Sequence, residues 1–347
     1  MQDSIPDDPW HVDPAGFTAC GSTRERLRFL VAYAVLAPSG HNTQPWIFRF
    51  LSEDKIELRA DRSRGLRVVD PDDRALVISC GAALANLRLA ATALGVTLHV
   101  EVLPEAVDPD LLARIHYAGE FHPAAPDGDA VLRALMARRT TRRRFSTESL
   151  PSMAMDAATQ AVEQDGDATL EWAIDQDRKH ALALLIAEGD RAQMADPAFR
   201  RELADWVHSR RAASRDGISG AAFGMPDLLS FAGALVIRSF DMGDGQAARD
   251  LALAEGAPAL AVITTYNDTP RDWMAAGEAM ERALIQLARD GFTYSYLNQP
   301  IEVPNLRPRL AAALSTTQSP QILIRIGRAL ADVPPAVRRP VSEVLRG

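Results

Sequence analysis

The chain has 347 residues, 47% of them hydrophobic and 24% charged, with a net charge of −8. This composition is typical of a globular protein with one large or two smaller domains, and so acidic a chain repels nucleic acid and anionic membranes. No apolar run reaches the about 18 residues of a membrane span, and the N-terminus lacks a signal-peptide pattern. We therefore expect a cytoplasmic protein that binds neither nucleic acid nor membrane.

Cysteine and histidine give no sign of a disulfide framework or a metal site. Cys20 and Cys80 form no CxxC pair and are expected to be buried small hydrophobic residues. The seven histidines show no ligand spacing, and we expect His116 and His122 to be surface or loop residues. There is no GxxxxGK[ST] phosphate loop, and the GDG at 243–245 is not a GxGxxG motif. We expect no metal and no adenine-nucleotide fingerprint.

The first part of the chain alternates helices and strands. A helix is predicted from a Ser22 cap to a stop at Pro38. The segments WIFRFL and KIELRAD, residues 46–51 and 55–61, are predicted to form a strand pair. A long apolar helix is predicted over residues 74–95.

A segment rich in Pro, Gly and Asp, Gly119–Asp129, is the expected boundary between two halves. The second half is predicted to contain a helix over 130–139, mixed helices, strands over 233–239 and 258–266, a long helix and a closing strand over 319–330. We assign residues 1–21 to an N-terminal extension, 22–125 to the first half and 126–347 to the second. Residues 206–231 match nothing in the first half, and their Gly, Ala and Ser content suggests a mobile insertion.

Two segments read alike, Gly81–Gly95 and Gly277–Gly291. Both begin and end on glycine, and small or apolar residues coincide at Ala83/Ala279, Leu84/Met280, Leu87/Ala283, Leu89/Ile285 and Ala91/Leu287. This spacing is helical, and a glycine at the end can take the left-handed conformation that stops a helix. Each segment is followed by an alternating strand pattern, at 96–100 and 292–296. We infer an internal duplication of two sheet-plus-helix halves and an α+β fold, with chance similarity of two helices as the alternative.

The run ARRTTRRRF, Ala137–Phe145, places five arginines in an acidic protein. A helix C-terminus accounts for Arg138 and Arg139, but not for the arginines that follow. A phosphate would relieve their mutual repulsion, because arginine binds such groups bidentately. A solvated basic patch is the alternative. The pair Arg338–Arg339 could join from the other end of the chain, or belong to an exposed tail.

The stretch PSGHNTQPW, Pro38–Trp46, gathers neutral hydrogen-bonding groups on one turn. Ser39, Asn42 and Gln44 together offer donors and acceptors, which suits a planar heterocycle with mixed edges such as a flavin. A polar turn that caps the preceding helix is the alternative. Together with the arginine run, the turn suggests a phosphorylated flavin without an adenine half.

Five stretches, in this order along the chain, resemble the nitroreductase superfamily and more narrowly the Acg-like branch of fused, twin nitroreductases. They are APSGHNTQPW, DPDDRALVISCGAALANLRLA, ARRTTRRRF, LNQPIE and PQILIRIGR. The resemblance extends from about Ser22 to Val344. It implies a nitroreductase-like α+β fold in which two halves of one chain mimic the usual homodimer around FMN.

The resemblance also implies which residues bind FMN. The expected contacts are Ser39, His41, Asn42 and Gln44 from the turn, Arg138, Arg139, Thr140, Arg142 and Arg143 from the phosphate stretch, Pro300, Ile301 and Glu302 beside the ring, where main-chain N–H groups can approach N5, and Arg338 and Arg339 at the phosphate. Arg144 stands where relatives often have proline, which leaves the register of the arginine run open by one position. The turn and the phosphate stretch each occur once, so one complete site and one inactive site are expected.

The function implied is an FMN-dependent oxidoreductase that passes hydride from NAD(P)H to a small acceptor such as a nitroaromatic or a quinone. The alternative is a flavin-sequestering protein with little turnover, in which residues 206–231 close over the flavin, hinged at Gly217, Gly220 or Gly224. An ordinary surface insertion is the other reading of that segment. Ser39 and His41 do not make a hydrolase, because they lie on one turn without a nucleophile elbow. Because the halves are fused, we expect a monomer.

Overall fold

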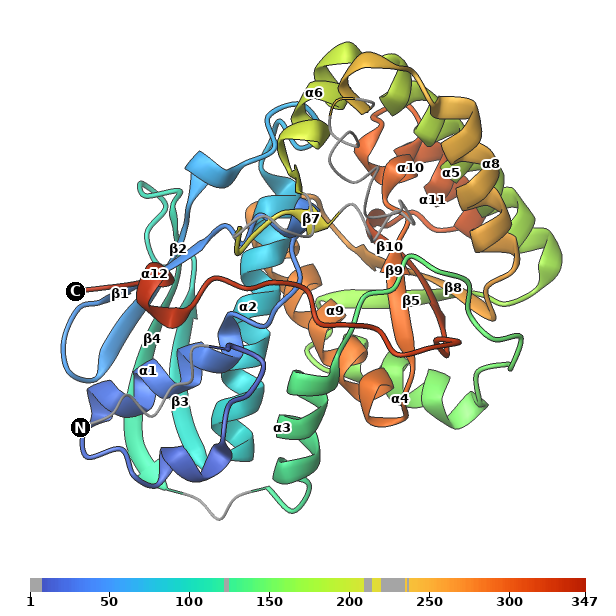
Figure 1. The fold of residues 1–347 in the computed structure, drawn as a ribbon. Helices are drawn as coiled ribbons and strands as arrows, with labels where there is room; N and C mark the ends of the chain where they lie inside the picture. The colour runs from blue at the N-terminus through green and yellow to red at the C-terminus, as the bar shows by residue number, and fades with distance from the viewer. Residues whose placement is uncertain (1–7, 122–124, 209–213, 220–234, 236) are drawn as a thin grey trace.

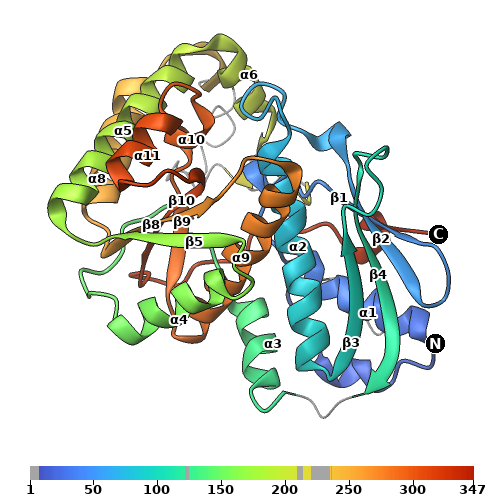
Figure 2. The same ribbon diagram turned by 180° about the vertical axis from the view of Figure 1, so that it is seen from behind.

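Two sheets lie on either side of a pair of long helices at the centre of the molecule (Figures 1 and 2). The computed structural model describes residues 8–121, 125–208, 214–219, 235 and 237–347. The two central helices are α2, Arg74–Ala93, and α9, Pro270–Arg289, and they pack against each other. The α+β fold class predicted from the sequence is therefore confirmed.

The first sheet has the strand order β11-β1-β2-β4-β3. Its strands are β1 Trp46–Phe50, β2 Lys55–Ala60, β3 Val96–Val102, β4 Leu111–Phe121 and β11 Leu345–Arg346. All neighbours are antiparallel except β1 and β11, which run parallel. Helix α1, Thr23–Ala34, packs against α2 and starts at a capping box formed by Ser22 and Glu25, as the predicted Ser cap requires.

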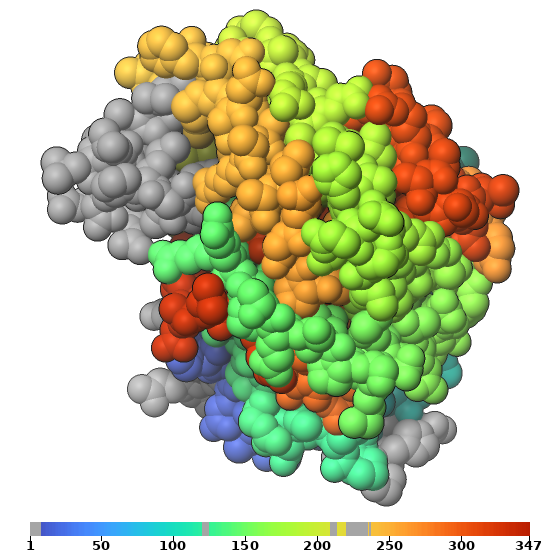
Figure 3. All heavy atoms as spheres, turned by 90° about the vertical axis from the view of Figure 1, so that its right-hand side faces the viewer, coloured from blue at the N-terminus to red at the C-terminus, as the bar shows by residue number. Residues whose placement is uncertain are grey.

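The second sheet has the order β5-β8-β10-β9 and is antiparallel throughout. Its strands are β5 Ala168–Ala173, β8 Ala259–Thr265, β9 Thr293–Tyr296 and β10 Ser319–Gly327. The helices around it are α4 Ser152–Glu163, α5 Gln176–Ala195, α8 Gly243–Glu255, α10 Gln299–Glu302 and α11 Arg307–Leu314. Helices α5 and α8 lie side by side and cover the sheet on the outer face seen in Figure 3. Every residue of β8 is buried, because the sheet is covered on both faces.

Two glycines allow the central helices to touch. A Cβ atom on Gly81 would lie 2.4 Å from the carbonyl oxygen of Met274, and one on Gly277 would lie 2.0 Å from that of Ile78. Only hydrogen fits at these two positions. These are the glycines that open the two similar segments of the sequence. The glycines that close them, Gly95 and Gly291, have φ of 73° and 76° and end the helices in the left-handed conformation.

Each central helix is followed by a strand, β3 after α2 and β9 after α9. The predicted order of helix, glycine stop and strand is thus present twice. A duplication event and the boundaries 22–125 and 126–347 stay predictions. The C-terminal residues return to the first sheet, where β11 pairs with β1 (Figure 1).

The remaining short elements connect these layers. They are η1 Pro14–Phe17, η2 Gly40–Asn42, η3 Arg62–Arg64, α3 Gly128–Ala137, α6 Pro197–Asp205, β6 Val207–His208, β7 Ile218–Ser219 and α12 Val341–Val344. The strand predicted over 233–239 is wrong for the residues that the structure describes there, because Leu235 and 237–239 are helical. β4 was not predicted at all.

Three smaller expectations from the sequence can also be compared with the structure. Cys20 and Cys80 are buried free thiols, as predicted. His116 is half-buried on β4 and its Nε2 lies 2.8 Å from Asp54 Oδ2, whereas His122 lies outside the described residues. By composition α2 is apolar enough to cross a membrane, so the expectation of no such run is wrong there. However, 78% of its apolar window is buried inside the protein, which identifies a core helix.

Candidate functional site

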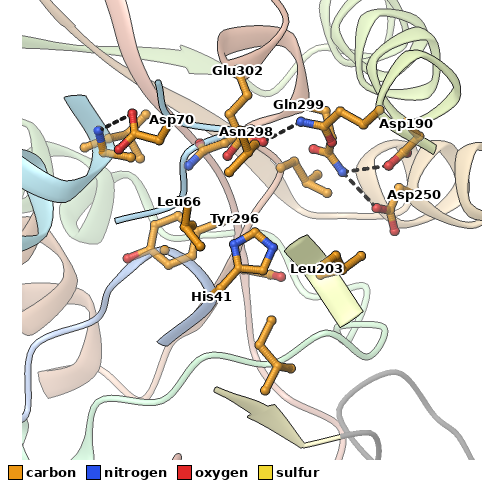
Figure 4. A pocket seen from close by; sticks show the side chains of 18 of the residues that line it. His41, Leu66, Asp70, Asp190, Leu203, Asp250, Tyr296, Asn298, Gln299 and Glu302 are labelled. Carbon is orange, nitrogen blue, oxygen red and sulfur yellow. Dashed lines mark hydrogen bonds between the residues drawn. The ribbon is translucent and has the colours of Figure 1, made fainter. Parts of the chain in front are cut away.

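A cavity of about 360 Å³ is lined by residues from 38–79 and from 142–325, which belong to the two predicted halves. Four of the predicted site residues line it: Ser39, His41, Arg142 and Glu302. Apolar side chains of α2, α6 and β10 make up much of the remaining wall, together with polar groups from α5, α8 and α10 (Figure 4). Its size and mixed lining are those of a pocket for a small organic molecule.

The turn at Pro38–Trp46 is held in an unusual backbone conformation. His41, Asn42 and Gln44 have φ of 48°, 57° and 52°, in the left-handed region that side chains other than glycine rarely adopt. The Gln44 N–H donates to Ser39 Oγ at 2.9 Å, which closes the turn. Such clustered strain persists only where the surroundings enforce it, and it is typical of binding sites.

The two carboxamides of the turn are bound to other parts of the protein and do not line the cavity. Asn42 Oδ1 accepts from Arg338 at 2.9 Å, and Gln44 Oε1 accepts from the Arg339 N–H at 2.7 Å. Their amide nitrogens donate to main-chain oxygens of residues 214–219, at 3.0 Å and 2.8 Å. In this structure the carboxamides join three distant segments, and their contact with a flavin stays a prediction.

His41 lines the cavity together with Ser39 of the same turn (Figure 4). Burial, and then the charge of Arg142, lowers the pKa of His41 to about 4. The imidazole is therefore neutral at neutral pH, with one donor and one acceptor nitrogen. It can orient a ligand by hydrogen bonding without adding charge.

The arginines of the run Ala137–Phe145 lie in two different places in the structure. Arg138 is buried, with its Nε 3.0 Å from Glu281 Oε1, and it donates to the Leu36 carbonyl at 2.6 Å and to the Tyr294 hydroxyl. Thr140 forms a backbone bridge with Tyr294, and Arg139 donates to the Met136 carbonyl at 2.6 Å. None of these three side chains lines the cavity.

Trp10 of the N-terminal extension lies among three of the predicted phosphate ligands. The guanidinium carbons of Arg138, Arg139 and Arg338 lie 6.0, 4.6 and 5.1 Å from its ring centroid. Arg338 and Arg339 are 5% and 7% exposed, so the exposed-tail reading of this pair is wrong. Burial, and then Arg138, lowers the pKa of Arg338 to about 9. These arginines gather as predicted, but their binding of a phosphate stays a prediction.

At the cavity wall a different set of arginines meets. Arg142, Arg249 and Arg325 all line the cavity, whereas Arg143 is exposed. Arg325 is 1% exposed on β10, and its Nε and Nη1 have no hydrogen-bond partner among the described residues. Burial lowers its pKa to about 10. Sequence reasoning missed Arg325, although an arginine inside the apolar strand QILIRIG was a usable signal.

Two carboxylates in the cavity wall share one carboxamide. Gln299 Nε2 donates to Asp190 Oδ1 at 2.9 Å and to Asp250 Oδ2 at 3.1 Å (Figure 4). Asp190 and Asp250 come from α5 and α8 and are 4% and 8% exposed. Burial raises the pKa of both carboxyl groups, that of Asp190 to about 8. Sequence reasoning missed both, because nothing in either helix alone marks them.

The PIE segment forms helix α10. Pro300 and Ile301 are buried, and Glu302 lines the cavity, where its Oε2 accepts from Gln193 at 2.7 Å. Burial raises the pKa of Glu302. The main-chain N–H groups of Ile301 and Glu302 donate to the Asn298 carbonyl at 2.8 Å and 3.0 Å. The predicted approach of these N–H groups to a flavin N5 stays a prediction.

A much smaller hollow lies at the corresponding place on α9. Ala75, Ile78 and Ser79 of α2 line the large cavity. When the two helices are aligned at Gly81 and Gly277, the residues of α9 that match these three are Arg271, Met274 and Ala275. They line a hollow of about 70 Å³. Of these two matching positions, the one beside α2 has the larger space. Within the described residues no group of three His, Cys, Asp or Glu side chains could hold a metal.

No family model matches the chain, but several proteins of Mycobacterium tuberculosis are similar to it. One, with the provisional name NAD(P)H nitroreductase, is 29% identical over 96% of this chain and 94% of its own. Another, provisionally named NAD(P)H nitroreductase acg, is 27% identical over 93% and 96%. An uncharacterized protein of the same species is 29% identical over 92% of each chain.

Solved structures show a weaker similarity. The FMN- and NADPH-dependent nitroreductase NfnB from a Sphingopyxis strain has a TM-score of 0.42 at 16% identity, covering 62% of this chain and 96% of that one. NfnB from Mycobacterium smegmatis, solved in complex with NADPH, has a TM-score of 0.40 at 17% identity, with the same coverage.

Proposed function

We propose that this chain is an FMN-dependent NAD(P)H oxidoreductase. It is similar over nearly its whole length to proteins provisionally named NAD(P)H nitroreductases, in agreement with the resemblance stated from its motifs. The observation that carries the proposal is the cavity between the halves, where the turn, the arginine run and the PIE segment each contribute a residue. Its acceptor would be a small molecule such as a nitroaromatic or a quinone.

The cavity is compatible with a flavin. Its volume of about 360 Å³ and its partly apolar wall suit a planar ring system. The buried Nε and Nη1 of Arg325, with no hydrogen-bond partner in the described part of the chain, are donors that an anionic or carbonyl oxygen would satisfy. FMN, when bound, supplies hydride transfer between a nicotinamide and an acceptor.

The protein's own groups would bind and orient the ligand. The rigid turn holds neutral His41 at the cavity, and Arg142 and Arg325 supply positive charge at its wall. Each charge-assisted hydrogen bond contributes about 1.5–3 kcal/mol, and micromolar binding requires about 8 kcal/mol, so two or three such bonds would supply part of this free energy and burial of the ring the rest. A phosphate bound by the Arg138, Arg139 and Arg338 cluster would lie outside the cavity, because none of these side chains lines it.

One observation favours flavin sequestration as the second candidate function. Within the segment proposed as a lid, Ile218 lines the cavity, and the Asp216 carboxylate forms an ion pair with Arg64. The turn residues Asn42 and Gln44 also bind this segment, so its described part is fixed against the cavity. Gly217 has φ of 73°, whereas the other proposed hinges, Gly220 and Gly224, lie outside the described residues.

Absorption spectra distinguish the two candidates. The purified chain should be yellow or become yellow with added FMN. Anaerobic NADPH or NADH should bleach it, and nitrobenzene or a quinone should restore the colour if the chain is a reductase. A yellow protein that neither nicotinamide bleaches would support sequestration. A colourless protein that takes up no FMN would contradict both.

A further inference from the structure

Asp190 is an acidic group of the cavity with a single hydrogen-bond partner among the described residues. It is 4% exposed, and only its Oδ1 is hydrogen-bonded, to Gln299 Nε2 at 2.9 Å. Its Oδ2 is buried without a hydrogen-bond partner among the described residues. Because the side chain lines the cavity, a ligand there is the available partner for this oxygen (Figure 4).

The charges that face Asp190 disfavour its ionised form. Asp250 on α8 is the nearest, since both carboxyl groups bind the same nitrogen of Gln299, and Glu302 on α10 adds a second like charge. On its own helix α5, Arg191 is a favourable but weak neighbour, because it is exposed and its Nε lies 3.0 Å from Asp244. The cavity arginines Arg249 on α8 and Arg325 on β10 act on Asp250.

We propose that Asp190 is a neutral carboxylic acid whose O–H donates a hydrogen bond to a carbonyl or nitro oxygen of a planar ligand in the cavity. Two oxygens of that kind are available under the proposed function, a ring carbonyl of FMN and the oxygen of the acceptor. The inference rests on the proposed function in one respect only, namely that FMN and the acceptor bind in this cavity. It also assigns specificity: neutral ligands with an acceptor oxygen are preferred over hydrocarbons of the same shape.

The pKa of Asp190, raised to about 8 by burial and then by Asp250, gives the proposal a pH signature. The donor is present below this pKa and is lost as the pH rises through it. Between about pH 7 and about pH 9 the protonated fraction falls about tenfold, and affinity for an acceptor oxygen should fall by a similar factor. A carboxamide at this position keeps a donor and cannot ionise.

The test is a binding measurement on the full chain without NAD(P)H, so it does not depend on turnover. One arm titrates FMN into the FMN-free chain, and the other titrates nitrobenzene into the FMN-loaded chain, near pH 7 and near pH 9. Toluene is the matched probe without an acceptor oxygen. If the chain takes up no FMN, the nitrobenzene arm is run on the chain as purified, so failure of the proposed function is recognised separately.

We expect one arm to weaken about tenfold at the higher pH, which identifies the oxygen that Asp190 binds, while toluene binding stays constant. Asp190→Asn should remove this pH dependence and the infrared carbonyl band of a protonated carboxylic acid. Asp250→Asn should move the midpoint to lower pH, because it removes the nearest like charge; this variant tests the proposal even if Asp190→Asn does not fold. Flat profiles in both arms of the unmodified chain, an unmoved midpoint in Asp250→Asn, or an unchanged band in Asp190→Asn would overturn the proposal.

Discussion

The faces of the two central helices differ although small or apolar residues coincide at several positions of the two helices. Beside α2 lies a cavity of about 360 Å³, and beside α9 a hollow of about 70 Å³. Ala75 and Ser79 on α2 correspond to Arg271 and Ala275 on α9, so one small residue is replaced by a long charged one. Of the two matching positions, the one beside α2 thus has the larger space.

The surroundings of the helices increase this difference. Helices α5 and α8 supply Asp190, Asp250 and Arg249 to the large cavity. At the small hollow, Arg282 lies 3.0 Å from Asp165 and Glu278 lies 3.1 Å from Arg88, so these two charged groups are paired within the protein. A binding site requires charges that its own protein leaves incompletely partnered, and these occur on the α2 side.

The largest effect is expected from breaking the helix crossing itself. Gly277→Ala places a Cβ 2.0 Å from the Ile78 carbonyl oxygen, so the helices must separate and both faces are lost. We expect the free energy of unfolding to fall by about 3 kcal/mol, measured by urea denaturation. Gly245→Ala on α8 is the matched control, because a Cβ there meets nothing within 4 Å. Equal stability of the two variants would refute the close crossing.

A second prediction concerns how much the buried carboxyl group of Asp190 lowers the stability of the folded chain. The folded pKa of Asp190 is raised from 3.8 to about 8, so its contribution to stability is full below the unfolded value and is lost as the pH rises towards 8. Asp190→Asn removes this loss, and at neutral pH it should stabilise the chain by about 3 kcal/mol. Thermal unfolding at several pH values tests this. A variant less stable than the unmodified chain at neutral pH would contradict it.

The third prediction compares the two faces directly through FMN affinity. Arg142→Ala removes a cation from the large cavity and should weaken FMN binding at least about tenfold, as expected for one charge-assisted hydrogen bond. Arg271→Ala removes a cation from the small hollow and should leave FMN affinity unchanged. Fluorescence titration of FMN measures both. Similar losses in the two variants would mean that the cavity assignment is wrong.

The smallest effect is expected from opening the small hollow. Asp165→Ala removes the partner of Arg282, and since the aspartate is 53% exposed, unfolding free energy should change by less than about 1 kcal/mol. The number of FMN molecules bound per chain should stay the same, because the hollow still lacks room. Uptake of an additional FMN by this variant would contradict this prediction. It would show that the two faces differ only in the space available and not in the arrangement of all their side chains.

Local signals in the sequence predicted the fold well. The Ser22 cap, the glycines Gly95 and Gly291 and the alternating strands act within a few residues, so their outcome can be read from the chain. The strand predicted over 233–239 failed because an apolar run suits a helix as well as a strand.

The site was less predictable, because it depends on contacts between distant segments. The motifs placed Ser39, His41, Arg142 and Glu302 at the cavity. They could not show that Asn42 and Gln44 are bound to the segments 338–339 and 214–219 instead. The Asp190–Gln299–Asp250 arrangement arises only when α5, α8 and α10 pack together, and no spacing along the chain encodes it.

The central claim is that one chain builds one flavin site between its own two halves. Native mass spectrometry of the FMN-saturated protein measures the number of chains and of FMN molecules in the same particle. The account predicts a single chain carrying one FMN. Two FMN per chain, or FMN found only on a dimer of chains, would contradict it.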